Sequence, residues 1–105
     1  MASTKTSSFV KLTAQPGRRD DLLAALQKML PVVADEEGTE VYSFHLDRGD
    51  ENAIWIFELY TDDDALAAHS STDAMKGLIE DLGALLGDAP LMVFTTPTDA
   101  KGIEV

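Results

Sequence analysis

Residues 53–60 read Ala-Ile-Trp-Ile-Phe-Glu-Leu-Tyr, and seven of these eight side chains are apolar or aromatic. Isoleucine and the aromatic residues favour β-strands, in which successive side chains point to opposite faces. The two faces carry Trp55, Phe57 and Leu59 on one side and Ile54, Ile56 and Tyr60 on the other. The pattern therefore predicts a strand that is apolar on both faces, with Glu58 as its one charged residue.

A second strand precedes this one along the chain. Residues 41–46 (VYSFHL) have the composition of a strand, and residues 47–52 (DRGDEN) are rich in turn-forming residues. Two strands joined by such a short polar segment form a β-hairpin. Residues 9–14 (FVKLTA) alternate in the same way, which predicts another strand that ends before Pro16-Gly17.

Helical spacing of apolar residues connects these strands. In the segment that begins at Arg18, several leucines, Met29 and Val33 recur at helical spacing, so we expect a helix there. Pro31 should kink this helix, and Gly38 should end it in a left-handed cap. A short helix should follow at residues 63–70, capped by Thr61 or Asp62. A longer helix should begin after residues 71–73 and end at Gly87.

The last predicted strand covers residues 91–95, so the element order is β-α-β-β-α-β. This order is typical of an α+β, ferredoxin-like fold, in which both helical segments cover one face of an antiparallel sheet. We expect one domain over residues 9–97, a flexible arm over residues 1–8 and a loose tail over residues 98–105. Helices on one face leave the apolar other face uncovered, which predicts a symmetric dimer that packs sheet against sheet.

Composition excludes several classes of partner and site. The 105-residue chain has a net charge of −11, which disfavours nucleic acid and anionic membranes as partners. It has no cysteine, so disulfides and thiolate chemistry are excluded. No stretch is apolar enough for a membrane span or a secretory signal, so we expect a cytoplasmic protein. The acidic runs at residues 47–52 and 62–64 are typical of a turn and a helix start, and we expect no metal site there.

Two residues are candidates for chemistry. Glu58 lies within an apolar strand, and His69 lies on the apolar side of the helix that follows, so the two side chains could approach each other. A carboxylate that holds an imidazole fixes its tautomer and raises its basicity, which would make His69 a general base. The alternative is a structural hydrogen bond between helix and sheet. Tyr42, Trp55, Tyr60 and mid-strand His45 are further candidates, for substrate contacts.

These residues resemble the antibiotic biosynthesis monooxygenase (quinol monooxygenase-like) family. The family pattern runs Tyr-x-x-x-x-Asp, then Glu-x-Trp, then Ala-x-x-x-His. Tyr42 and Asp47 fit its first part, Glu58 its second, and Ala65 with His69 its third. One departure is that Tyr60 stands where the family has tryptophan.

The resemblance implies a dimeric α/β barrel that oxygenates a small aromatic, quinol or polyketide-like substrate with dioxygen and no bound cofactor. It implies His69 as the base, Glu58 as its orienting partner, and Tyr42, Trp55 and Tyr60 as pocket residues. Haem-degrading relatives have that tryptophan and an asparagine in the first strand. This chain has Tyr60 at the one position and no asparagine in residues 9–14, which disfavours haem chemistry. Two alternatives remain: an isomerase or reactive-carbonyl-protective enzyme of the same fold, and a non-catalytic module for small-molecule binding or dimerisation.

Overall fold

The predicted strand at residues 53–60 is β3 (Ala53–Tyr60), and it has a neighbouring strand along each edge. The computed structural model describes residues 3–105, which form a four-stranded sheet in the order β2-β3-β1-β4. The other strands are β1 (Thr6–Thr13), β2 (Thr39–Leu46) and β4 (Leu91–Thr95). Every neighbouring pair is antiparallel. The predicted hairpin is therefore confirmed as β2–β3.

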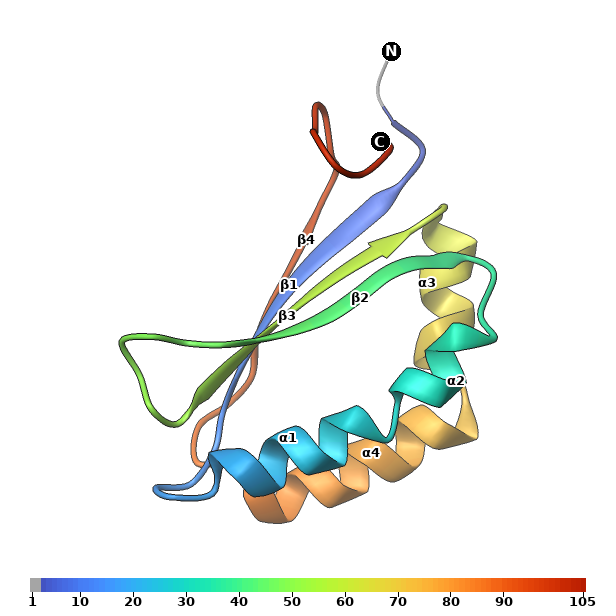
Figure 1. Ribbon diagram of the computed structural model, residues 1–105. Coiled ribbons are helices and arrows are strands. Elements are labelled where there is room, and N and C mark those ends of the chain that lie inside the picture. The colour runs from blue at the N-terminus through green and yellow to red at the C-terminus, as the bar shows by residue number, and fades with distance from the viewer. Residues whose placement is uncertain (1–2) are drawn as a thin grey trace.

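Four helices lie on one side of this sheet, and the other side is left open (Figure 1). They are α1 (Arg19–Gln27), α2 (Leu30–Ala34), α3 (Asp63–Ser70) and α4 (Asp73–Leu85). The side chains of Asp62 and Thr72 accept hydrogen bonds from the first turns of α3 and α4. The α+β, ferredoxin-like order of elements is confirmed, with each helical connection divided into two helices.

The first helical connection differs from its prediction at Pro31. We expected one kinked helix, but α1 ends at Gln27 and a separate helix, α2, begins at Leu30. Proline has no N–H group and clashes with the preceding turn, so it is tolerated in the first turn of a helix and not in its interior. Pro31 accordingly lies in the first turn of α2.

Gly38 also has a different role from the predicted left-handed cap. The helix ends at Ala34, and only Gly17 and Gly102 have positive φ angles among the described residues. Gly38 instead lies against α3, where a Cβ atom on it would be 2.4 Å from the Cβ of Ala65. Glycine is required here because the loop before β2 approaches α3 closely.

The first strand begins earlier than predicted. β1 starts at Thr6, so residues 6–8 belong to the sheet and not to the flexible arm predicted over residues 1–8. Ser7 and Ser8 are buried, because their hydroxyl groups find hydrogen-bond partners inside the fold. Residues 1–2 lie outside the described residues. The tail over residues 98–105 contains no helix or strand, and the Glu104 carbonyl accepts a hydrogen bond from Lys5.

The apolar core lies between the sheet and the helices. Its fully buried members include Leu22 and Leu26 of α1 and Ile54 of β3. On the opposite face of the sheet, Phe9, Leu91 and Val93 are about half exposed. Within residues 3–105, none of the helices has the length and apolar character needed to cross a membrane.

Candidate active site

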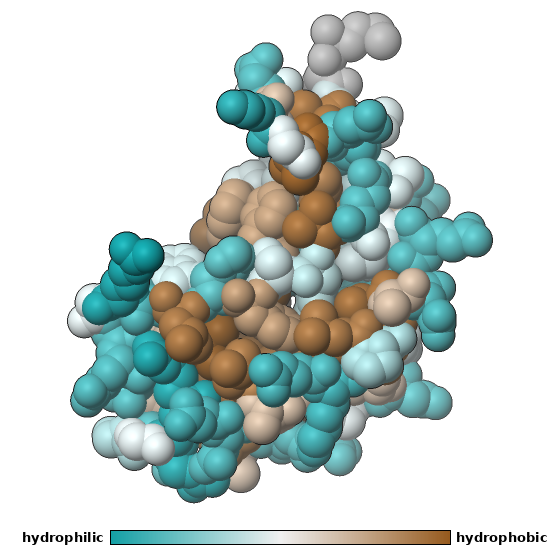
Figure 2. Space-filling view, in the orientation of Figure 1, coloured by the Kyte–Doolittle hydropathy of each residue, from teal (hydrophilic) through white to brown (hydrophobic). Residues whose placement is uncertain are grey.

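A cavity of about 430 Å³ lies between the sheet and helix α4. Apolar side chains form most of its wall, among them Met75, Leu78 and Leu82 of α4 and Phe94 of β4. Figure 2 shows apolar residues gathered across the middle of the molecule, between the sheet above and the helices below. The polar side chains of the wall are Glu58, four residues near it, and Ser70. The four residues near Glu58 are Ser8, Tyr42, Tyr60 and His69.

Glu58 is held in this wall by two hydroxyl groups. The alternation of β3 places Glu58 on the helix-facing side, where its neighbours across the sheet are Ser8 and Tyr42. Its Oε2 atom accepts a hydrogen bond from the Ser8 hydroxyl at 2.9 Å, and its Oε1 atom accepts one from the Tyr60 hydroxyl. Burying a carboxylate is costly unless it is hydrogen-bonded, and these two bonds offset that cost.

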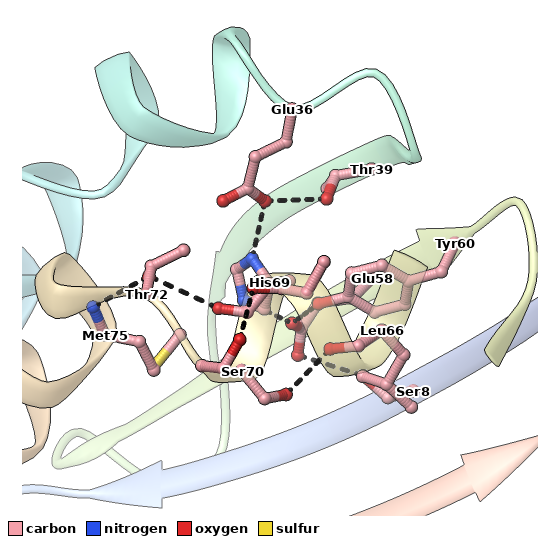
Figure 3. Close-up of polar contacts among 12 residues, drawn as sticks. Ser8, Glu36, Thr39, Glu58, Tyr60, Leu66, His69, Ser70, Thr72 and Met75 are labelled. Carbon is pink, nitrogen blue, oxygen red and sulfur yellow. Dashed lines mark hydrogen bonds and ion pairs between the residues drawn. The ribbon is translucent and has the colours of Figure 1, made fainter. Parts of the chain in front are cut away.

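His69 of α3 lies beside Glu58 but is hydrogen-bonded to a different residue (Figure 3). Its side chain is 3% exposed, and its Nδ1 atom is 2.7 Å from Oε1 of Glu36, in the loop after α2. Its Nε2 atom is 3.6 Å from Oε1 of Glu58, which is beyond hydrogen-bonding distance. Nε2 is buried and has no hydrogen-bond partner within residues 3–105. The imidazole is therefore anchored through one nitrogen and free at the other.

Two tyrosine rings flank the imidazole. The ring centroids of Tyr42 and Tyr60 are 5.5 Å and 5.3 Å from that of His69. Burial and the nearby Glu58 carboxylate raise the pKa of Tyr42 and of Tyr60 well above the usual value of 10.0. Both phenols are therefore kept in the protonated form, as hydrogen-bond donors.

The structure does not bring Trp55 and His45 to this site. Both residues are on the opposite face of the sheet from Glu58, and neither lines the cavity. The Trp55 indole donates a hydrogen bond to Asp47 at 2.7 Å, and His45 is hydrogen-bonded to Ser43 at 2.8 Å. Trp55 is three residues before Glu58, an odd separation that places the two on opposite faces of a strand. The structure therefore places Trp55 and His45 away from this cavity, on the open face of the sheet.

Two residues of the site escaped the sequence analysis. Ser8 has the same alternation as Val10 and Leu12, so extending the strand by one step would have found it. Glu36 has no such signal, because it lies in a loop and contacts His69 across 33 positions of the chain. Within residues 3–105, no three His, Asp or Glu side chains are grouped so that they could hold a metal ion.

Because Tyr42 and Tyr60 are the only tyrosines, their titration can be followed directly. A raised pKa in the folded state means that the folded protein retains protons that the unfolded chain has lost. We expect no tyrosinate absorbance near pH 10 while the circular dichroism is native. Stability should be unaffected below pH 10 and should fall above it, because only the unfolded chain then ionises its phenols. Tyrosinate absorbance that rises near pH 10 in folded protein would contradict this burial.

Comparisons with known proteins agree with this fold. The model of the antibiotic biosynthesis monooxygenase family matches residues 8–81. A candidate antibiotic biosynthesis monooxygenase from Caulobacter crescentus has a TM-score of 0.87 at 23% identity, with 92% of each chain covered. A second such candidate, from Chloroflexus aurantiacus, has a TM-score of 0.81 at 27% identity, covering 95% of this chain and 99% of that one. No curated protein matches the sequence. Since the family model covers well over half of its residues, the chain belongs to the antibiotic biosynthesis monooxygenase family.

Proposed function

We propose that this protein is a cofactor-independent monooxygenase that acts on a small aromatic, quinol or polyketide-like substrate. The observation that carries the proposal is the imidazole of His69. It is buried in the wall of an apolar cavity, and its Nε2 atom has no hydrogen-bond partner in the part of the chain that the structure describes. An imidazole nitrogen without a hydrogen bond, in the wall of an apolar cavity, is suited to remove a proton from a bound hydroxyl group. Membership of the family and the structural likeness to candidate monooxygenases support the same reaction class.

The reaction begins with the transfer of a substrate proton to Nε2 of His69. The resulting anion passes an electron to dioxygen far more readily than the neutral phenol does, and the two radicals then combine through a new carbon–oxygen bond. For an anthrone, the ring methylene becomes a carbonyl group, and the second oxygen atom leaves as water with the two hydrogens. The substrate supplies all the electrons in this scheme.

Glu58 and the two tyrosines support this step in different ways. Once Nε2 carries a proton, the Glu58 carboxylate 3.6 Å away compensates the positive charge. Ser8 and Tyr60 hold that carboxylate in place. The hydroxyl of Tyr42 lies at the same end of the cavity and is kept protonated, so it can donate to the developing oxyanion of the substrate.

The cavity favours a neutral, mostly apolar substrate with one acidic hydroxyl group. Its wall is apolar except around Glu58 and His69, and the net charge of −11 disfavours substrates that are already anionic. Hydroquinones, naphthols and anthrones meet these requirements.

Oxygen uptake with a panel of these compounds tests the proposal. We expect at least one compound to consume dioxygen in proportion to enzyme, and to gain one oxygen atom from isotopically labelled dioxygen. Proton exchange or isomerisation without oxygen uptake would favour the isomerase alternative. Binding without turnover across the panel would favour the non-catalytic module.

We propose further that the working form is a symmetric dimer joined through the open face of the sheet. Phe9 and Phe57 form a ring pair there with centroids 5.2 Å apart, next to the half-exposed side chains of Leu91 and Val93. Soluble monomers rarely leave such a group of large apolar residues in water. A second copy would cover this face without covering the helices.

Light scattering should therefore give about twice the chain mass of 11.3 kDa at micromolar concentration. Val93→Asp places a charge on the open face, beside Phe9, and should shift the mass towards the monomer. Ile79→Asp is the matched control, because Ile79 is also exposed but lies on α4, on the helical side of the sheet. A folded wild-type protein that stays monomeric at these concentrations would refute the dimer.

A further inference from the structure

We infer that Glu36 is a positioning residue that fixes the tautomer of His69, with the proton on Nδ1 and the lone pair on Nε2. The role of this tautomer in turnover rests on the function proposed above, whereas the tautomer itself follows from the hydrogen bonds around the imidazole. Neither the sequence pattern nor the family resemblance points to Glu36.

The hydrogen bonds of Glu36 determine which atom carries the proton. Its Oε1 atom accepts a hydrogen bond from the Thr39 hydroxyl at 2.8 Å and lies 2.7 Å from Nδ1 of His69. A carboxylate offers only acceptors, so Nδ1 has to be the donor in this contact. If the proton were on Nε2 instead, the lone pairs of Nδ1 and of Glu36 Oε1 would face each other at 2.7 Å in the protein interior.

The surroundings of Nε2 agree with this assignment. The nearest acidic group is Glu58 at 3.6 Å, and both of its oxygen atoms already accept hydrogen bonds from Ser8 and Tyr60. Nε2 itself has no partner among the described residues. The imidazole therefore keeps its lone pair on Nε2, in a side chain that lines the cavity.

The fold holds Glu36 firmly in this position. The backbone N–H of Glu36 donates to the Val33 carbonyl at 3.0 Å, and the Gly38 carbonyl accepts from the backbone N–H of Thr61 at 2.9 Å. Gly38 also packs directly against Ala65 of α3, the helix that carries His69. The close approach that requires glycine at position 38 thus brings the Glu36 carboxylate over the imidazole.

The variant Glu36→Gln distinguishes a positioning role of Glu36 from a merely structural contact, because it changes the tautomer of His69 and keeps the shape of the side chain. The Oε2 atom of Glu36 is buried, and none of the described residues forms a hydrogen bond with it. An amide NH₂ group placed there would be unsatisfied, whereas the same group turned towards Nδ1 and the Thr39 hydroxyl finds two acceptors. Glu36→Gln should therefore donate to Nδ1, move the imidazole proton to Nε2 and remove the basic lone pair from the cavity, with little change in shape.

Nitrogen NMR of the histidine side chains tests the inference without any substrate. The protein has two histidines, so a His45→Gln variant assigns the signals of His69. At a pH at which the imidazole is neutral, we expect a protonated Nδ1 and an unprotonated Nε2 in the wild type, and the reverse in Glu36→Gln. A wild-type His69 with its proton on Nε2, or one that never becomes neutral while the protein is folded, would overturn the inference.

Turnover provides the second arm of the experiment. If the proposed oxygenase activity exists, Glu36→Gln should lower it by about ten- to 10⁴-fold per folded molecule, as a wrong tautomer does in other imidazole-dependent enzymes. Glu37→Gln removes the same charge from the adjacent exposed residue and serves as the control. The expected tautomers without any oxygen uptake would refute the proposed function and leave the role of Glu36 standing. Unchanged turnover in Glu36→Gln with a reversed tautomer would refute the positioning role.

Discussion

His69→Ala is expected to lower oxygen uptake with an accepted substrate by roughly 10²–10⁴-fold, the usual contribution of a positioned general base. The reason is geometric: among the side chains of the cavity wall, His69 provides a buried nitrogen that has no hydrogen-bond partner among residues 3–105. Turnover should be measured per folded molecule, alongside the melting temperature. His45→Ala is the matched control, because the other histidine lies on the opposite face of the sheet and should not affect the chemistry.

The double variant of His69→Ala with Glu58→Gln distinguishes catalysis from structure. Glu58→Gln alone should lose less turnover than His69→Ala, because the base remains and only the charge that supports its protonated form is removed. The double variant should be little worse than His69→Ala, since residues that act as one unit are not additive. A purely structural cluster would behave differently: both single variants would lose melting temperature, and the folded protein would keep normal turnover.

The architecture could be predicted because apolar residues repeat with a clear period in most elements. The continuous apolar runs of β3 and β4 and the helical spacing in α4 are strong signals, and the bounds of β3 and β4 match their predictions. The predictions failed where the same residues are compatible with two different local structures. Pro31 is compatible with a kink or with a new helix, and Ser7 and Ser8 are compatible with a frayed end or with a satisfied buried strand.

The candidate site was predictable only in part, for a related reason. Glu58 and His69 stand out because each is a polar residue within an apolar pattern. Glu36 lies in the sequence Asp-Glu-Glu at residues 35–37, where nothing distinguishes it from its exposed neighbours. Its contact with His69 depends on how the loop before β2 packs on α3, and this is a tertiary property that a linear pattern does not contain.

The largest expected effect on stability is at Ile54 of β3, at the centre of the core. Ile54 is 0% exposed and packs in the main core cluster between sheet and helices. Ile54→Ala removes buried methylene groups and leaves a cavity, which should cost about 2–5 kcal/mol of unfolding free energy. That is a large share of the roughly 5–15 kcal/mol that stabilises a small domain. Denaturant unfolding at a fixed protein concentration measures the loss.

Ile79→Ala is the control for Ile54→Ala. It makes the same chemical change where the side chain is 60% exposed, and should cost less than about 1 kcal/mol.

Phe57→Ala tests the open face in the same assay. Phe57 is only partly buried within one chain, so its cost should depend on protein concentration if a second copy covers it. Equal costs for Ile54→Ala and Ile79→Ala would mean that the sheet does not pack on the helices as described. A concentration-independent cost for Phe57→Ala would instead place that side chain within the fold of one chain, and would remove the open face as the surface for a second copy.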